Sequence, residues 1–446
     1  MKYRDYLLEQ KDNMIEELKK FVSINSVYDK STVAKGKPFG EGVSNALEYV
    51  AKLGESHGFS VDRCDGYATE LTIGAGDKMI GIFAHADVVP ATGDWSKPPF
   101  ECYEKDGKLY GRGTSDDKGP FMSAFYAVLA LHQAGLLKNY RVRIVVGGDE
   151  ERGSGCLDYY FKTLKKPSPT YGFTPDADFP VIYGEKGIND FFPEIDVEIP
   201  HVKSIKGGAA TNAVCDKVEI ELDDTKEVVE YCKKNSIEHL VNGNVVIILG
   251  KSAHGSTPEL GVNAAIKTLQ LLGEIFDVPT LVKLAEGLSY TNGEKFGGFC
   301  KTKLMGETTY CVGMISYEKG HLKFSVNFRY PEVVKPVEYI EKFDAYFGTK
   351  SVRGEESHLL FFDPNSKLVK TLMKAYVKET KDRSHGPITI GGGTYAKHCE
   401  NTVAFGALFP GRESIMHQPD EFMPIKDIHD SAFIYARAIY LLGKLK

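Results

Sequence analysis

The sequence predicts an α/β protein, in which a mixed sheet with helices on both faces is interrupted by an inserted α+β domain. Short apolar segments in the first part of the chain end in polar residues, as buried parallel strands do. From about Ile188 strand-like and helical segments alternate in a pattern typical of antiparallel α+β structure. Strand character of the first kind resumes at residues 388–390, and 446 residues are too many for one simple core.

The first part of the chain, residues 1–187, contains most of the α/β domain. Apolar residues at helical spacing predict two helices before the first strand, and the second of these ends near Gly58. Pro120, with acids just before it, is typical of a helix start. The expected elements are helices at 6–21 and 43–57, strands at 70–73 and 79–83, a helix over 121–131, and strands at 141–146 and 171–174.

The inserted domain is expected over residues 188–383, and the α/β domain is expected to resume over 384–446. The stretch from Lys381 to Pro387 is polar and separates the two, and a last helix is expected from Lys426 to Leu442, with Gly443 just past its end. Within the insert the pattern predicts strands at 189–199, 218–222, 244–249 and 322–328, and helices at 225–235, 261–276 and 336–347.

Composition excludes several classes of function. The net charge of −6 gives no support for binding to nucleic acid or to an anionic membrane surface. The N-terminus has no signal-peptide pattern, and no apolar run is long enough to span a bilayer. The 8 cysteines are scattered without a Cys-x-x-Cys pair, which argues against a zinc ribbon and favours reduced thiols in the cytoplasm.

Strand after strand in the first part ends in a histidine or an acid. His85 follows the strand at 79–83, and Asp87 is placed to fix the imidazole tautomer as carboxylates do beside metal-bound histidines. Taken alone, this pair is more often a polar loop. The acids at 116–117, 149–151 and 176 favour a metal site instead, because independent solvated loops would not be expected to place a histidine or an acid at the ends of four segments.

Each of these groups also has an ordinary structural interpretation. Asp116 and Asp117 could cap the helix that follows, although one acid is enough for that. Gly391–Thr394 could be a plain glycine-rich loop, or its backbone N–H groups could bind an anion such as a carboxylate. His417, in a loop flanked by acids, could simply be exposed to solvent.

Together these motifs resemble the co-catalytic zinc peptidases and deacylases that include carboxypeptidase G, acetylornithine deacetylase, succinyl-diaminopimelate desuccinylase and carnosinase. The bacterial dipeptidase V and carnosinase branch is the most similar. The matches run in the family's order over most of the chain. They are His85-x-Asp87, Gly111-Arg-Gly-x-x-Asp116-Asp117-Lys-Gly, Asp149-Glu150-Glu151-x-Gly-Ser, Thr174-Pro-Asp176-Ala-Asp-Phe-Pro, Gly184-Glu-Lys-Gly, Asn327-Phe-Arg329-Tyr-Pro and His417.

The resemblance implies a zinc-peptidase catalytic domain with two metal ions. His85 and Asp176 would hold one ion, Glu151 and His417 would hold the other, and Asp116 would bridge both, with a cis peptide bond between Asp116 and Asp117. Asp87 would orient His85, and Glu150 would be the general base that takes a proton from a shared water. Nitrogen and oxygen ligands without a thiolate suit Zn²⁺, with Mn²⁺ or Co²⁺ as possible substitutes.

The insert carries marks that resemble the family's lid domain. The segment around His254, residues 250–264, matches the motif whose histidine binds the oxyanion. A P-loop interpretation of Gly250-Lys-Ser fails because Val245 stands where that motif needs its first glycine. Residues 207–215 match the motif of Asn212, with Cys215 in place of the usual proline. Arg329, Gly392, Gly393 and Thr394 would hold a substrate carboxylate.

We therefore expect a metal-dependent dipeptidase acting on dipeptides with free N- and C-termini. The alternative is a deacylase or carboxypeptidase acting on N-acyl amino acids, and a catalytically silent metal-binding protein would be expected to lack Glu150 or a ligand. His-Glu-x-x-His is absent, which excludes a single-zinc protease of that class. The insert is about twice the roughly 100 residues of one small module, so we expect a doubled lid and a monomer in which His254 serves the active site of its own chain.

Overall fold

The computed structural model describes residues 3–445, and the chain divides into two compact units. The first unit comprises the chain up to Gly184, Phe362–Ile388 and the chain from Gly393 on. The second unit comprises Glu185–Phe361 and Thr389–Gly392. Two short strands, β20 (Leu360–Phe361) and β21 (Ile388–Ile390), lie in the segments where the chain passes from one unit to the other.

The second boundary of the insert differs from the one we predicted at residue 383. Helix α10 (Lys367–Thr380) belongs to the first unit, where it packs against α11 (Ile425–Gly443) and buries Leu368, Leu372 and Tyr376 in that unit's core. The polar stretch after Thr380 is a loop within the first unit. In the sequence this polar stretch resembles a domain boundary, because the pattern alone does not show which unit covers the apolar face of α10.

A mixed sheet forms the centre of the first unit. Its strands follow the order β1-β2-β6-β3-β7-β22-β9, in which β3 pairs in parallel with β6 and β7, and β22 with β7, whereas β2 and β9 are antiparallel to their neighbours. The bounds are β1 Ser60–Asp62, β2 Ala68–Gly74, β3 Met79–His85, β6 Arg141–Gly147, β7 Tyr171–Thr174, β9 Ile182–Glu185 and β22 Thr402–Ala404.

Strand β3 is buried along its whole length, as expected of a parallel strand covered on both faces. Smaller ladders complete the strands of this unit. They are β4 (Tyr103–Lys105), β5 (Lys108–Tyr110) and β24 (Phe422–Pro424) in one sheet, and β8 (Ala177–Asp178) and β23 (Ala407–Leu408) in another.

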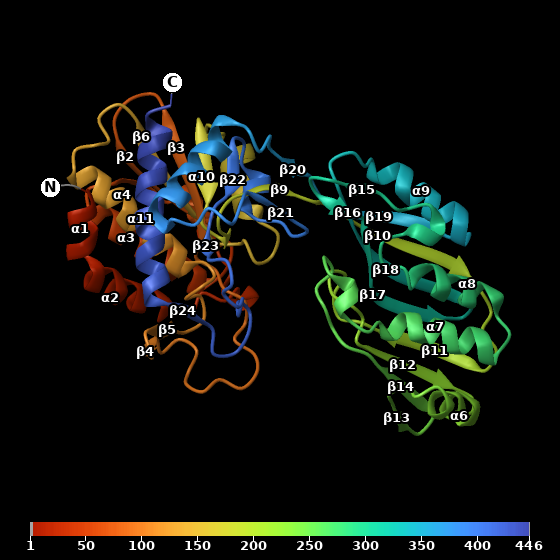
Figure 1. The fold of residues 1–446 in the computed structure, drawn as a ribbon. Helices are drawn as coiled ribbons and strands as arrows, with labels where there is room; N and C mark the ends of the chain where they lie inside the picture. Colours follow the sequence, from red (N-terminus) through yellow and green to blue (C-terminus); the bar gives the residue numbers. More distant parts are fainter. Residues whose placement is uncertain (1–2, 446) are drawn as a thin grey trace. The chain divides into compact units, whose positions relative to one another are not determined.

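Helices α4 (Lys118–Gln133) and α11 pack against one another, and both contact β3 (Figure 1). Almost every side chain of α4 is buried, which explains its nearly continuous apolar sequence after Pro120. The single helix predicted over residues 6–21 is two helices in the structure, with a break at Gln10. Gly443, which we predicted just past the end of the last helix, is the last residue of α11. The remaining helices of the unit are α1 Tyr3–Glu9, α2 Lys11–Val22, α3 Glu41–Ser56 and α5 Gly155–Asp158.

The main sheet of the second unit is antiparallel, in the order β13-β14-β12-β11-β17-β18-β10-β19. One half of this sheet, β11 to β14, is continuous in sequence, and the other half combines β10 with β17, β18 and β19. The strands are β10 Gly187–Asp196, β11 Val202–Gly207, β12 Lys217–Leu222, β13 His239–Asn242, β14 Val245–Leu249, β17 Thr309–Glu318, β18 His321–Tyr330 and β19 Lys350–Ser357. A separate two-stranded ladder pairs β15 (Lys301–Thr302) with β16 (Gly306–Glu307).

Four longer helices accompany this sheet: α6 Lys226–Lys234, α7 Ala264–Ile275, α8 Pro279–Leu288 and α9 Pro336–Phe347. Buried residues of the helices and strands form a second core, separate from that of the first unit. Strand β12 alternates strictly between exposed and buried residues, as a strand with one covered face does. No helix within residues 3–445 combines the length and the apolar character that a membrane crossing requires.

Candidate metal centre

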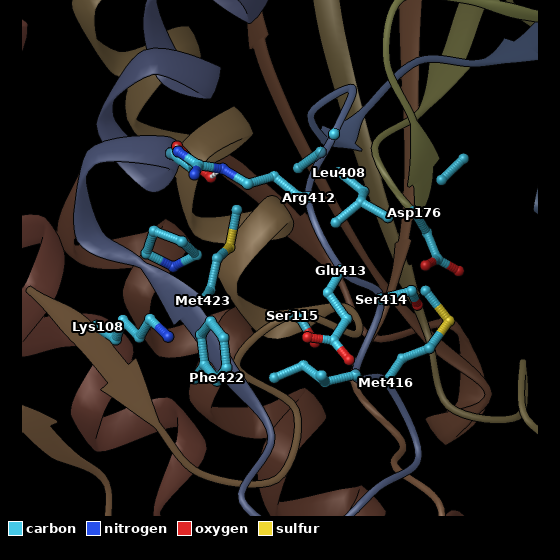
Figure 2. A pocket seen from close by; sticks show the side chains of 16 residues that line it. Lys108, Ser115, Asp176, Leu408, Arg412, Glu413, Ser414, Met416, Phe422 and Met423 are labelled. Atoms are coloured by element: carbon cyan, nitrogen blue, oxygen red, sulfur yellow. Dashed lines mark hydrogen bonds and ion pairs between the residues drawn. The ribbon is translucent and has the colours of Figure 1, made fainter.

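A cavity of about 250 Å³ opens in the first unit beside the carboxyl end of β7 (Figure 2). Asp176, which follows β7, and Ser115, which precedes α4, line one side of it. The register of β3 and β6 pairs His85 with Gly147, so the two strands end at the same edge of the sheet. Open α/β sheets bind ligands at the carboxyl ends of their parallel strands, and this edge carries the predicted histidine and acids.

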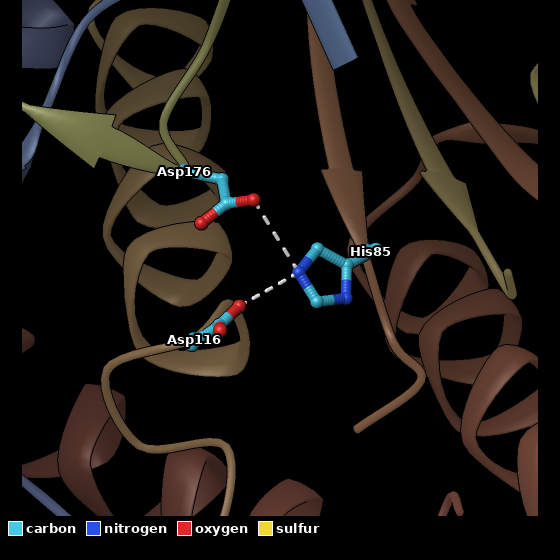
Figure 3. Close-up of side chains that lie close together, drawn as sticks. All are labelled: His85, Asp116 and Asp176. Carbon is cyan, nitrogen blue, oxygen red and sulfur yellow. Dashed lines mark hydrogen bonds and ion pairs between the residues drawn. The ribbon is translucent and has the colours of Figure 1, made fainter. Parts of the chain in front are cut away.

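His85, Asp116 and Asp176 converge at this edge (Figure 3). The Nε2 atom of His85 lies 2.9 Å from Oδ1 of Asp116 and 3.5 Å from Oδ2 of Asp176. The His85 side chain is fully buried, and the two acids are largely buried. One nitrogen and two carboxylate oxygens directed at one point form a group that could hold a metal ion.

A second group of the same kind uses the other oxygen of Asp116. Its Oδ2 atom lies 2.9 Å from Nε2 of His417, and Oε2 of Glu151 lies 3.2 Å from the same nitrogen. The structure therefore brings together all five residues that we predicted as metal ligands, in two groups that share Asp116. The peptide bond between Asp116 and Asp117 is cis, as the resemblance implied.

The charges at the two groups favour a bound cation. Burial raises the pKa of Glu151 to about 7, with a further contribution from the charge of Asp116. Hydrogen bonds with Asp116 and Glu151 raise the pKa of His417 to about 10. Burial also raises the pKa of Asp176. Crowded carboxylates repel one another, and a divalent cation relieves this repulsion and takes the place of the imidazole proton.

Asp87 holds both the histidine and the acidic loop. Its backbone oxygen lies 2.9 Å from Nδ1 of His85, and its Oδ1 atom lies 3.4 Å from the same nitrogen. Its carboxylate accepts the backbone N–H groups of Glu150 at 3.1 Å and Glu151 at 3.2 Å. Asp87 thus fixes the ring orientation that turns Nε2 of His85 toward Asp116 and Asp176.

Glu150 belongs to neither metal group, although it lies between Asp149 and Glu151. Burial raises its pKa well above the usual value, and the charges of Asp176 and Glu151 raise it further, whereas His85 lowers it. A carboxylate whose pKa is raised is a stronger base, and its protonated form can return the proton. This environment suits the role of general base that the resemblance implied.

Glu421 is a buried residue of this centre to which we gave no role from the sequence. Its carboxylate accepts the backbone N–H groups of Gly113, Ser115 and Asp116, at 3.1, 2.9 and 3.3 Å, and the Ser115 hydroxyl at 2.9 Å. It also pairs with Nη1 of the buried Arg112 at 2.7 Å. Glu421 thereby ties the loop that carries Asp116 to the loop that carries His417. Its position four residues after His417 was the only sequence signal.

In the second unit, the loops that carry Asn212 and His254 are joined through their backbones. The N–H group of Gly255 donates to the carbonyl of Asn212 at 2.7 Å, and Ala213 pairs with His254 as an isolated bridge. A Cβ atom at Gly255 would lie 2.8 Å from the Asn212 carbonyl and from Oδ1 of Asn327, so this close approach requires glycine.

Arg329 is 2% exposed and is held by two acceptors in the same unit. Its Nε atom donates to Oδ1 of Asn327 at 2.8 Å, and Nη1 donates to the carbonyl of Gly391 at 2.6 Å. Burial lowers its pKa to about 10, which still leaves the guanidinium charged at neutral pH. An immobilised guanidinium of this kind suits recognition of a carboxylate.

The predicted glycine-rich turn is divided between the units. Gly392 belongs to the second unit, whereas Gly393 and Thr394 belong to the first. The Thr394 hydroxyl accepts the N–H group of Ala396 and begins the short helix η6 (Tyr395–His398). Binding of an anion by the backbone of this turn stays a prediction.

Residues 81–441 match the peptidase family M20/M25/M40, and the chain belongs to this family of metallopeptidases. A protein of Staphylococcus epidermidis named "Putative dipeptidase" is 36% identical over 469 residues, which cover 99% of each chain. "Putative dipeptidase YtjP" of Bacillus subtilis is 35% identical over 473 residues and the full length of both.

Solved structures show the same fold at low sequence identity. Human carnosine dipeptidase 1 has a TM-score of 0.61 at 15% identity, with coverage of 100% of this chain and 98% of that one. The dipeptidase Dug1p of Saccharomyces cerevisiae has a TM-score of 0.59 at 14% identity, with full coverage of both chains. The α/β architecture with a separate antiparallel domain is therefore the fold of this family.

Proposed function

We propose that the protein is a dipeptidase that hydrolyses dipeptides with free N- and C-termini by means of two zinc ions. The observation that carries this proposal is the position of Asp116, whose two carboxylate oxygens face His85 and His417 at 2.9 Å each. Two histidine and carboxylate groups that share one acid form the donor set of a two-metal hydrolase. Relatives that match over the whole chain and are named as dipeptidases support the choice of substrate.

The donor chemistry fits zinc. His85, Asp116 and Asp176 would hold one ion, and Asp116, Glu151 and His417 would hold the other. Each group offers nitrogen and oxygen ligands without a thiolate, which suits Zn²⁺ and also permits Mn²⁺ or Co²⁺. When bound, such ions polarise the scissile carbonyl and lower the pKa of a water molecule.

The remaining steps belong to side chains of the protein. Glu150 takes the proton from the attacking water and delivers it to the leaving amine as the carbon–nitrogen bond breaks. His254 stabilises the negative charge that develops on the carbonyl oxygen. Arg329 and Asn212, with the turn at Gly392, Gly393 and Thr394, bind the C-terminal carboxylate of the substrate.

The second candidate is a deacylase or carboxypeptidase for N-acyl amino acids. It would use the same metal groups and bind a substrate carboxylate in the same way. An M20 family metallo-carboxypeptidase of Sulfolobus solfataricus shares the fold with a TM-score of 0.58. The two candidates differ in whether the substrate needs a free N-terminal amine.

A substrate panel with added Zn²⁺ or Mn²⁺ tests the proposal. Dipeptides should be hydrolysed, whereas the matching N-acetylated dipeptides, N-acyl amino acids and tetrapeptides should react much more slowly. Equal rates on N-acyl amino acids would favour the deacylase, and hydrolysis of tetrapeptides at the rate of dipeptides would remove the size limit.

We further propose a monomer in which His254 serves its own chain.

A further inference from the structure

The ring of His254 is held by the serine two residues after it. Oγ of Ser256 lies 2.6 Å from Nδ1 of His254, and the backbone N–H group of Ser256 donates to the same nitrogen at 3.4 Å. The backbone N–H group of Thr257 donates to the carbonyl of His254 at 2.9 Å and closes this turn. Two polar groups of one residue therefore meet the Nδ1 side of the imidazole ring.

These two contacts decide which ring nitrogen carries the proton. A hydroxyl can donate or accept, but a backbone N–H group only donates, so Nδ1 of His254 must offer its lone pair. In a neutral imidazole, the hydrogen bond made by one nitrogen determines that the other is protonated. The hydroxyl of Ser256 then donates to Nδ1 as well, and the proton of neutral His254 lies on Nε2.

We propose that Ser256 is a positioning residue that keeps the proton of neutral His254 on Nε2 and so makes this nitrogen the donor to the oxyanion. This inference rests on the proposed function, in which His254 stabilises the charge on the carbonyl oxygen. Such stabilisation needs a donor that is oriented before the charge develops. The other tautomer would present a lone pair at Nε2 and would repel the negative oxygen.

Ser256 is itself held in place by Gly391. A Cβ atom at Gly391 would lie 2.8 Å from Cβ of Ser256, so a larger residue there would displace the serine. The carbonyl of Gly391 accepts Nη1 of Arg329 at 2.6 Å. Ser256, His254, Gly391 and Arg329 all belong to the second unit, whereas the five predicted metal ligands belong to the first. Loss of the Ser256 hydroxyl should therefore affect the oxyanion donor and leave the metal ligands intact.

Ser256→Ala removes the hydroxyl and leaves one long backbone contact at Nδ1. In dipeptide hydrolysis by the zinc-loaded enzyme, kcat should fall about 2- to 13-fold, the net value of one hydrogen bond, with little change in KM or zinc content. Ser256→Thr keeps a hydroxyl, and its methyl group has space because a cavity of about 440 Å³ adjoins Ser256. Its kcat should stay within about 2-fold of the wild-type value.

Ser252→Ala is the matched control, because Ser252 is an exposed serine of the same loop, and it should keep the wild-type kcat. Thermal unfolding identifies a variant that has not folded. A kcat of folded Ser256→Ala equal to that of the control would overturn the proposal, and so would an equal loss of kcat in Ser256→Ala and Ser256→Thr.

The tautomer can also be measured directly on protein labelled with nitrogen-15 in histidine, because protonated and unprotonated ring nitrogens differ in chemical shift. The chain has 12 histidines, so the signals of His254 are identified as those lost in His254→Ala. At a pH where free imidazoles are neutral, Nε2 should be protonated in the wild type, and Ser256→Ala should show both tautomers. A protonated Nδ1 in the wild type would overturn the proposal. This measurement needs no substrate, so failure to hydrolyse any dipeptide would remove the proposed function alone.

Discussion

The side-chain amide of Asn327 donates a hydrogen bond of 2.5 Å to Asp190, and through this contact Asp190 determines where Arg329 points. The other oxygen of Asp190 accepts the hydroxyl of Thr211 at 2.6 Å, and Thr211 immediately precedes Asn212. One carboxylate on β10 therefore positions both residues that we assign to the substrate carboxylate.

Asp190→Ala should weaken the binding of dipeptides. If the lost positioning of Arg329 and Asn212 weakens their hydrogen bonds to the substrate carboxylate by about 1–3 kcal/mol, KM should rise about 5- to 150-fold, while kcat changes little. Dipeptide amides, which lack the carboxylate, should show a smaller change, and Arg329→Ala should raise KM at least as much.

Glu194→Ala is the control for this prediction, because Glu194 lies on the same strand and pairs with Lys323 at the surface. Exposed pairs of this kind contribute about 0–1 kcal/mol. If Asp190→Ala leaves KM unchanged, or lowers kcat equally for dipeptides and their amides, Asp190 does not position the carboxylate-binding residues.

Glu150→Gln and Glu151→Gln should separate proton transfer from metal binding. Glu150 lies outside both metal groups, so its amide variant should keep both ions and lose on the order of 10²–10⁴-fold in kcat. Glu151 lies within one group, so its variant should lose metal as well as activity. Elemental analysis with steady-state kinetics measures both effects. Normal activity in a fully metallated Glu150→Gln enzyme would show that another group is the base.

Glu421→Gln should lower metal affinity by about 10- to 100-fold, as loss of a buried partner of a ligand usually does. The neutral amide accepts hydrogen bonds less strongly and leaves the charge of Arg112 without its carboxylate partner. Asp420→Asn provides a matched control, because Asp420 accepts its hydrogen bonds from Ser96 and is partly exposed. Titration with a competing chelator measures the affinities. Equal affinities in the two variants would mean that Glu421 has no effect on the metal centre.

Removal of metal should abolish hydrolysis, and addition of zinc should stabilise the fold. Excess EDTA should eliminate activity because the attacking water depends on the ions. Zinc at about 100 times its Kd should add about 2.7 kcal/mol per bound ion to the free energy of unfolding, because it binds the folded chain. Denaturant titration with and without zinc measures this increase, and His417→Ala should show less of it. Full activity in metal-free protein, verified by elemental analysis, would refute the two-metal proposal.

A mixing experiment tests whether the chain works as a monomer. Glu150→Gln and His254→Ala should each be inactive alone, and their mixture should also be inactive if His254 serves its own chain. Light scattering should give the mass of one chain of 49.4 kDa. Recovery of activity in the mixture would show that His254 acts on a partner chain.

The sequence predicted best the strands and site residues that depend on local patterns. Strand β3 could be recognised from its uninterrupted apolar residues, and His85 from its place at the strand's end. The five residues of the two metal groups are distant in sequence, and motif resemblance rather than periodicity placed them in one centre. The second unit contains an eight-stranded sheet, and its interpretation as a doubled lid stays a prediction.

What the sequence did not reveal depends on contacts between distant segments. Asp420 and Glu421 are adjacent and chemically alike, yet only Glu421 meets the backbone of the loop at 111–117 and is fully buried. The apolar face of α10 could belong to either unit until α11 is seen to cover it. The cavity beside Asp176 is lined by residues that are distant in sequence, from Lys108 to Asp427, so no local pattern predicts it.

Asp116 completes both metal groups, and its two oxygens cannot be oriented independently. An ion in either group fixes this carboxylate and neutralises part of its charge, so occupation of one group changes the affinity of the other. Thermodynamic linkage makes the effect reciprocal and equal in free energy in both directions. The enzyme should therefore show stepwise metal affinities that belong to the pair of groups, and a substitution at either histidine should alter the affinity of the group it does not touch.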